Sequence, residues 1–168
     1  MSDPGPTLPH VRFEQRTLPN GLRVIVAPDN LAPVVAINLW YDVGSKHEVK
    51  GKTGFAHLFE HFMFQGSRHV AKAEHMALIQ GAGGINNATT FFDRTNYFET
   101  LPSHQLELGL WLEADRMATL LAAVSQENLD NQRDVVKDEK RQRYDNRPYG
   151  SFYEKLMGAV EQLVSGDD

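Results

Sequence analysis

Near the start of the chain, apolar and polar residues alternate with the period of a β-strand. Apolar and β-branched residues run through positions 13–18, Pro19-Asn20-Gly21 interrupts them, and Leu22–Val26 alternates again. Two such runs about a short Asn-Gly turn are typical of a β-hairpin. Val34–Tyr41 is apolar almost throughout, so we expect a third strand there that is largely buried.

The pattern changes to the period of a helix over residues 53–64. Five apolar side chains recur there at helical spacing: Phe55, Leu58, Phe59, Phe62 and Met63. A second helix is expected over Ala71–Gln80, before a run of glycines. Asn87–Phe92 and Asn96–Leu101 then predict two further strands, joined by a turn at Asp93-Arg94-Thr95.

The remainder of the chain has a helical pattern. Ser103 is a suitable N-cap, and the helix after it carries an apolar stripe that we expect to face the core: Leu106, Leu110, Ala114, Met117 and Leu121. Another helix is predicted from Ser125 to Asn146, and a last amphipathic segment begins at Tyr149. Strands followed by helices, with a hairpin between helices, predict an α+β domain whose sheet is covered on one face.

Length and composition fit one globular domain, because the chain has 168 residues, of which 41% are hydrophobic and 23% charged. Pro4, Pro6 and Pro9 favour an extended segment, so we expect a flexible arm over residues 1–12 and the folded domain over 13–168. The first residues resemble no secretory signal, and no apolar run approaches the roughly 20 residues that span a bilayer. We therefore expect a cytoplasmic protein.

The net charge and the absence of cysteine limit which partners and which metal ligands are expected. The formal net charge is −5, which provides no positive field for nucleic acid or for an anionic membrane surface, and we expect neither as a partner. The chain contains no cysteine, so a bound metal would need histidine and carboxylate ligands.

The segment His57-Leu58-Phe59-Glu60-His61 carries the clearest chemical signal. Residues of a helix advance by about 100° each, so His61 lies about 40° from His57, and Glu60 lies about 60° to the other side. Two imidazoles one turn apart can bind a single zinc ion, and a carboxylate beside them can reach a water on that ion without being a ligand. The order H-x-x-E-H is a metalloprotease signature.

The chain resembles the pitrilysin/insulinase metalloproteases, also called inverzincins. The resemblance spans most of the sequence, in the blocks LPNGLRVIV, GFAHLFEHFMFQGS, GGINNATTFFDRTNYFETLP, LEADRM and QRDVVKDEKRQ. It implies a mixed, mostly antiparallel sheet with helices packed on one face, as in pitrilysin and mitochondrial processing peptidase. It also implies a bound Zn²⁺ and a zinc-dependent endopeptidase that cleaves extended or unfolded peptides.

The resemblance also assigns residues. His57 and His61 would be zinc ligands, Glu60 the general base, and Glu139, 78 positions after His61, the third ligand. Helical spacing places Glu139 on an inward-facing side of its helix, although the many charges around it are equally typical of a solvated helix. Gln132 departs from the family pattern, which often has a glutamate there. An amide can only hydrogen bond, so we expect Gln132 to affect catalytic rate rather than zinc binding.

Substrate and partner are implied in the same way. The segment around Asn87 and Ala88 resembles the edge strand on which family members bind a peptide as an added strand. Family members pair two homologous domains, and this chain covers only the first, so we expect a truncated domain that needs a homologous second domain or subunit, or that self-associates. The alternative is a non-catalytic scaffold of the same family, or an inactive fragment, and peptide cleavage would separate these possibilities.

Overall fold

The computed structural model describes residues 11–49, 53–152, 155–156 and 158–160. The chain forms two compact units, Met1–Pro33 and Val34–Asp168. Most of the predicted arm, at residues 1–10, and the end of the chain, at 161–168, lie outside the described residues. The prediction of a flexible arm therefore stays a prediction.

The first unit contains the predicted hairpin. Strands β1 (Glu14–Thr17) and β2 (Arg23–Val26) pair in antiparallel fashion. The turn between them contains Gly21, whose φ of 88° favours glycine. The Asn20 side chain accepts the N–H of Leu22 at 3.1 Å. Local turn chemistry thus accounts for this element.

The second unit is built on an antiparallel sheet with strand order β3–β5–β4. These strands are β3 (Val34–Tyr41), β4 (Ile85–Thr90) and β5 (Thr95–Pro102). Thr95 of β5 lies opposite Tyr41 on one side and opposite Thr90 on the other. The strand β4 lies at an edge of this sheet, and among the described residues it pairs with β5 alone.

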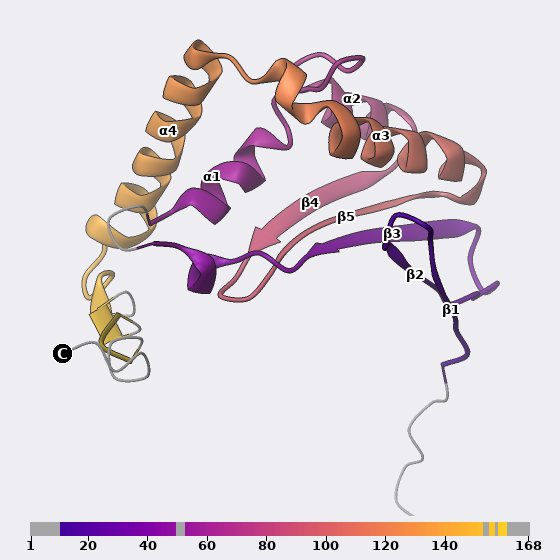
Figure 1. Cartoon of the computed structure of the whole chain (residues 1–168), viewed down its shortest axis with the longest axis horizontal. Helices are drawn as coiled ribbons and strands as arrows, with labels where there is room; N and C mark the ends of the chain where they lie inside the picture. Colours follow the sequence, from indigo (N-terminus) through magenta and orange to yellow (C-terminus); the bar gives the residue numbers. More distant parts are fainter. Residues whose placement is uncertain (1–10, 50–52, 153–154, 157, 161–168) are drawn as a thin grey trace, which may run out of the picture. The chain divides into compact units, whose positions relative to one another are not determined.

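Helices cover one face of this sheet (Figure 1). Helices α1 (Phe55–Phe62), α2 (Glu74–Gly81) and α3 (Leu106–Thr119) each contact a sheet strand, while α4 (Gln126–Lys140) packs against α1. The α+β fold class is confirmed. The unit also contains four short helical turns, at Ser45–His47, Ser103–Gln105, Leu120–Ala123 and the π-helical Arg141–Asp145, and the described residues 152, 155–156 and 158–160 are helical as well.

The strand β3 is less buried than its apolar sequence suggests. Its residues alternate between exposed and half-buried, and Trp40 is 64% exposed. The prediction of a largely buried strand is wrong, because helices cover only one face of this unit's sheet. On the other face, the guanidinium of Arg94 lies 4.8 Å from the centre of the Trp40 ring, a distance at which cation and ring attract.

The side of helix α3 that faces the sheet is not the side that was predicted to do so. Ser103 lies in the preceding short turn, and the helix begins at Leu106. Four of the five stripe residues are large hydrophobics with exposed side chains, whereas the buried side carries Gly109, Leu112, Glu113, Asp115 and Arg116. A Cβ at Gly109 would come within 2.6 Å of Glu99, so the helix approaches the sheet along this glycine.

The core consists of two apolar clusters. Val70, Ile79, Leu101 and Leu112 form the first cluster, between α2, α3 and the sheet. The second cluster is Met63, Ala88 and Tyr97, and half-buried side chains pack around it: Tyr41, Phe64 and Leu120. The end of α1 is thereby held against the middle of the sheet.

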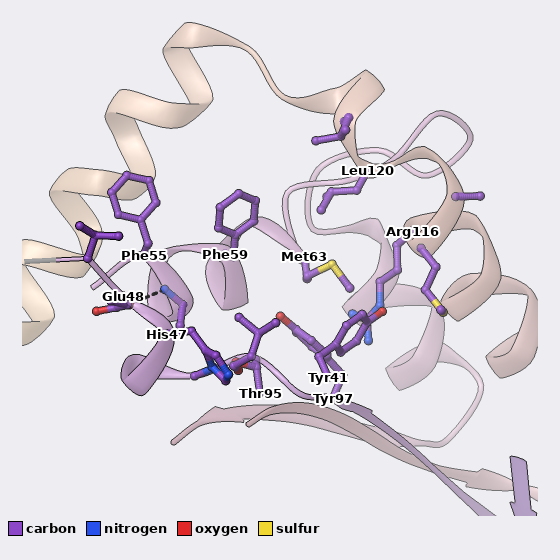
Figure 2. Close-up of a pocket in the computed structure, with 17 residues that line it drawn as sticks. Tyr41, His47, Glu48, Phe55, Phe59, Met63, Thr95, Tyr97, Arg116 and Leu120 are labelled. Atoms are coloured by element: carbon purple, nitrogen blue, oxygen red, sulfur yellow. Dashed lines mark hydrogen bonds between the residues drawn. The ribbon is translucent and has the colours of Figure 1, made fainter. Parts of the chain in front are cut away.

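A cavity of about 650 Å³ lies beside the second cluster (Figure 2). Its apolar lining includes Phe55 and Phe59 of α1, Tyr41 of β3, and Leu120 and Leu121 beyond α3. Phe55 and Phe59 lie on the side of α1 opposite to His57, by the helical repeat. Within the described part of the chain, no helix is long and apolar enough to cross a membrane.

Candidate metal centre

Helix α1 carries the H-x-x-E-H segment, and its first turn is held by a carboxylate from outside the helix. Glu48 accepts the N–H of Gly54 at 2.7 Å and the N–H of Ala56 at 2.8 Å. A negative charge there satisfies two of the free N–H groups of the helix start and opposes the positive end of the helix dipole. His57 directly follows Ala56, the second residue whose N–H Glu48 accepts.

We expect the substitution Glu48→Ala to lower the free energy of unfolding by about 0.5–2 kcal/mol, the usual cost of losing a helix cap. Chemical denaturation of the metal-free chain measures this change. Asp134→Ala is a matched control, because Asp134 is an exposed carboxylate whose partner Lys137 lies 3.7 Å away, and such pairs contribute little. Equal stabilities of the two variants would contradict the capping role.

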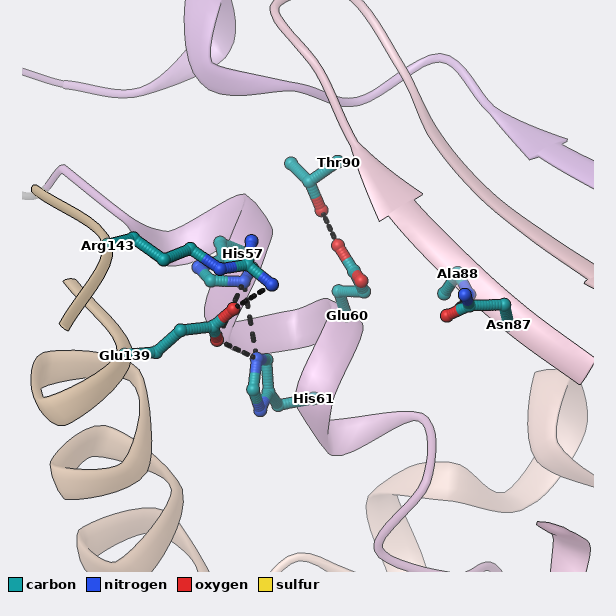
Figure 3. Close-up of polar contacts among 8 residues, drawn as sticks. All are labelled: His57, Glu60, His61, Asn87, Ala88, Thr90, Glu139 and Arg143. Atoms are coloured by element: carbon teal, nitrogen blue, oxygen red, sulfur yellow. Dashed lines mark hydrogen bonds and ion pairs between the residues drawn. The ribbon is translucent and has the colours of Figure 1, made fainter. Parts of the chain in front are cut away.

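Three side chains converge between α1 and α4 (Figure 3). The Nε2 atoms of His57 and His61 lie 3.2 Å apart, and the Glu139 Oε2 atom lies 3.5 Å and 3.2 Å from them. Tetrahedral zinc with ligand distances of 2.0–2.1 Å separates its ligands by about 3.3 Å. The donor set and its spacing therefore fit a zinc ion.

Helix α4 presents Glu139 to this site. Ser125, where the helix was predicted to begin, caps α4 by accepting the N–H of Asn128 at 3.1 Å. Gln132 is buried and Glu139 has a side chain only 22% exposed, so this side of the helix faces inward. Arg143, one turn further on, contacts the second oxygen of Glu139 at 2.7 Å, which leaves Oε2 toward the imidazoles.

The surroundings of His57 lower the pKa of its imidazole. Burial, together with the neighbouring His61, lowers the pKa of His57 from its ordinary value, while the nearby Glu139 and Glu60 carboxylates raise it to a smaller extent. Only a neutral imidazole has a lone pair for a metal. The lowered pKa therefore favours the coordinating form at neutral pH.

Glu60 points away from the three converging side chains, toward β4 (Figure 3). Its Oε2 atom accepts a short hydrogen bond from the hydroxyl of Thr90, the last residue of β4. Asn87 and Ala88, the predicted substrate-binding residues, lie on the same edge strand. The structure thus places the predicted base between the metal-ligand candidates and the strand.

Gln132 does not reach these groups. Its side chain is 5% exposed, and its amide donates to the side chain of Asn131 at 3.0 Å. Among the described residues, no hydrogen bond joins it to His57, His61 or Glu139. An effect of Gln132 on the site would therefore act through packing of α4.

A second group of ionisable residues lies beneath α3. His75 of α2, Glu99 of β5 and Glu113 of α3 are all buried, with donor atoms within 4.8 Å of one another. Arg116 donates hydrogen bonds to both oxygens of Glu113. Burial raises the pKa of Glu113, although Arg116 opposes that rise. Arg116 and Glu113 thus form a buried ion pair within α3, and the His75 Nε2 atom lies 3.5 Å from the Glu99 Oε2 atom.

Three residues at the site were not singled out by the sequence: Glu48, Thr90 and Arg143. Arg143 follows Glu139 by four residues, and this helical spacing could have indicated the pair. Thr90 is 30 residues from Glu60, and Glu48 is eight residues from Ala56. No local pattern marks these two contacts.

The comparisons with known proteins agree with this arrangement. The sequence model of the family described as Insulinase (Peptidase family M16) matches residues 23–162. Together with the α+β fold, this match places the chain among the metallopeptidases by family and fold. The chain belongs to the insulinase family, peptidase family M16.

Relatives share this part of their sequences with the chain. The chain is 36% identical over 150 residues to the zinc protease PqqE of Helicobacter pylori. The matched region covers 89% of this chain and 33% of that protein. The chain is 31% identical over 114 residues to the mitochondrial-processing peptidase subunit beta of Blastocladiella emersonii, covering 68% of this chain and 24% of that subunit. The chain therefore spans a third or less of the length of these relatives.

Two solved structures have the same fold. The crystal structure of a protease from Helicobacter pylori superposes with a TM-score of 0.81 and 35% identity, over 86% of this chain and 34% of that one. Pitrilysin superposes with a TM-score of 0.70 and 23% identity, over 80% of this chain and 14% of pitrilysin. The similarity to pitrilysin shows a shared fold and nothing more.

Proposed function

We propose that this chain is the metal-binding part of a zinc endopeptidase. The observation that carries the proposal is the convergence of His57, His61 and Glu139 at distances suited to tetrahedral zinc. Two neutral imidazoles and one carboxylate leave a bound Zn²⁺ with a net positive charge and room for a fourth ligand. The names of the relatives, which include zinc proteases, support the choice of metal.

Glu60 is the proposed general base. Zinc bound here would lower the pKa of a water molecule and polarise the peptide carbonyl. Glu60 lies one residue before His61 on the same helix but takes no part in the three-donor group. A carboxylate in that position can accept the proton of the attacking water and return it to the leaving amine.

The proposed substrate is an extended peptide bound along β4. Among the described residues, no strand pairs with the outer edge of β4, and Asn87 and Ala88 lie in its middle, where the Asn87 side chain accepts the N–H of Ala88 at 2.9 Å. A peptide added as a further strand would be held by main-chain hydrogen bonds, which depend little on its sequence. Selectivity would then come from side-chain pockets rather than from the strand itself.

A homologous second domain or subunit is the proposed partner. The relatives are about three times as long as the matched region, and exposed apolar side chains of α3 and the large cavity next to α1 offer surface for further polypeptide. Such a partner would close the site opposite β4. Without it, the edge strand would position only one side of the substrate.

We therefore expect the chain alone, even when loaded with zinc, to cleave unfolded peptides several powers of ten more slowly than the complete assembly. Positioning of reacting groups can lower a barrier by about 7–11 kcal/mol, and the proposed partner would supply the opposing part of the positioning surface. Cleavage of a quenched fluorescent peptide, with and without second-half polypeptides from family relatives, measures the difference. Fast cleavage by the purified monomer would contradict this expectation.

The same assay decides between the enzyme and a non-catalytic scaffold. A scaffold would bind zinc and the second-half polypeptide yet show no cleavage in any mixture. Cleavage that appears on mixing and disappears after metal removal would support the endopeptidase.

A further inference from the structure

We propose that Thr90 is a positioning residue: its hydrogen bond to Glu60 sets the orientation of the proposed base relative to the proposed metal site. This inference rests on the proposed function, since it assumes that Glu60 is the base. It starts from one contact between distant parts of the chain, in which the Thr90 hydroxyl donates a hydrogen bond to the Glu60 Oε2 atom. A residue that acts through Glu60 in this way need not touch the substrate.

The sheet fixes the Thr90 side chain. Thr90 is the last residue of β4 and pairs with Thr95 across the hairpin. Side chains alternate along a strand, and Thr90 shares the helix-facing side of β4 with the buried Ala88. A β-branched side chain has few χ1 choices in a strand, so the hydroxyl is held in place before it meets Glu60.

The neighbouring threonine shows that this arrangement is specific. Thr89 faces the other side of the sheet, where its hydroxyl donates to the Asn96 side chain at 2.5 Å and accepts from Arg94 at 2.8 Å. Thr89 and Thr90 are therefore chemically identical side chains on adjacent residues, and only Thr90 contacts Glu60. Thr89 provides a matched control.

The hydrogen bond constrains a flexible side chain. A free glutamate has three rotatable bonds, and a site gains by having its carboxylate already oriented. Thr90 donates a hydrogen bond to one carboxylate oxygen of Glu60. The other oxygen is then left to accept the proton of the attacking water. Because Thr90 and Ala88 lie on one strand, the same bond also fixes the base relative to the proposed peptide-binding edge.

The first test needs neither metal nor substrate. In a double-mutant cycle with Thr90→Val and Glu60→Ala, chemical denaturation of the metal-free chain measures whether the two substitutions act independently. We expect the Thr90→Val effect to be smaller when Glu60 is already absent. Additive effects would show that the two side chains are uncoupled and would overturn the inference.

The second test uses Co²⁺ bound in place of zinc, because its visible absorption responds to groups beside the open coordination position. We expect Thr90→Val to change the spectrum in the same direction as Glu60→Ala, with cobalt content unchanged. Thr90→Ser, which keeps the hydroxyl, and Thr89→Val, the control, should both retain the parent spectrum. Where cleavage is measurable, kcat should fall about 10–100-fold in Thr90→Val, the usual effect of losing such a partner, with KM little changed.

The possible outcomes distinguish a failure of the positioning role of Thr90 from a failure of the proposed endopeptidase function. If Glu60→Ala changes the spectrum and Thr90→Val does not, Thr90 has no positioning role, and the proposed function stands. If Glu60→Ala leaves both spectrum and cleavage as in the parent, or if the chain binds no cobalt, the proposed function fails and this inference fails with it.

Discussion

Replacing Glu60 by glutamine is expected to leave the zinc content of the chain unchanged and to lower peptide cleavage by about 10²–10⁴-fold, the usual contribution of a general base. Glutamine keeps the shape of the side chain and can still accept the hydrogen bond from Thr90. It cannot take up the proton of a water molecule at neutral pH. Metal analysis and a peptide assay with the second-half polypeptide present measure the two quantities.

The control for this substitution is Glu107→Gln, at an exposed position in the first turn of α3. It changes the same chemical group at a position far along the chain from α1, so cleavage should stay at the parent level. Loss of zinc from Glu60→Gln as complete as from a histidine variant would show that Glu60 is a ligand. The division of roles within α1 would then be wrong.

Replacing His57 or His61 by alanine is expected to weaken zinc binding by more than about 100-fold, which exceeds the effect typical of an outer partner of a metal ligand. Each variant leaves two donors where a protein zinc site needs three or four. Glu139→Gln should also weaken binding, because an amide oxygen lacks the negative charge of the carboxylate. Zinc content after dialysis, and competition with a chelator of known affinity, measure these changes.

His104→Ala is the matched control for the histidine variants, because His104 is exposed and lies outside both groups of convergent ionisable residues. It should retain zinc at the parent level. If His57→Ala bound as much zinc as His104→Ala, the metal would lie elsewhere. The buried group of His75, Glu99 and Glu113 would then be the next place to examine.

Several features could be predicted from the sequence because they depend on neighbours along the chain. The Asn20-Gly21 turn, the Ser125 cap and the placement of His57 and His61 on one side of a helix all involve contacts within four residues. Local periodicity also located the helices and strands, although most ends differ by up to about three residues and α4 ends at Lys140, before a π-helical turn, rather than at Asn146. The inward direction of Glu139 followed from the same helical repeat.

Other features depended on which surfaces meet in three dimensions. The apolar stripe of α3 predicted the wrong buried side, because Glu113 and Arg116 neutralise each other and Gly109 allows close approach to the sheet. Apolar content likewise overstated the burial of β3, whose second face is uncovered within its unit. Periodicity measures the apolar character of a face but not which element covers it.

The sequence by itself determined the donor types and their helical spacing, since a helix places residues four apart on one side whatever surrounds it. Only the tertiary structure decided that α4 brings Glu139 to within 3.5 Å of both imidazoles. It alone also showed that Glu48 caps α1 and that the Thr90 hydroxyl donates a hydrogen bond to Glu60. These contacts join residues that no local period relates, and they form only when the sheet and helices pack.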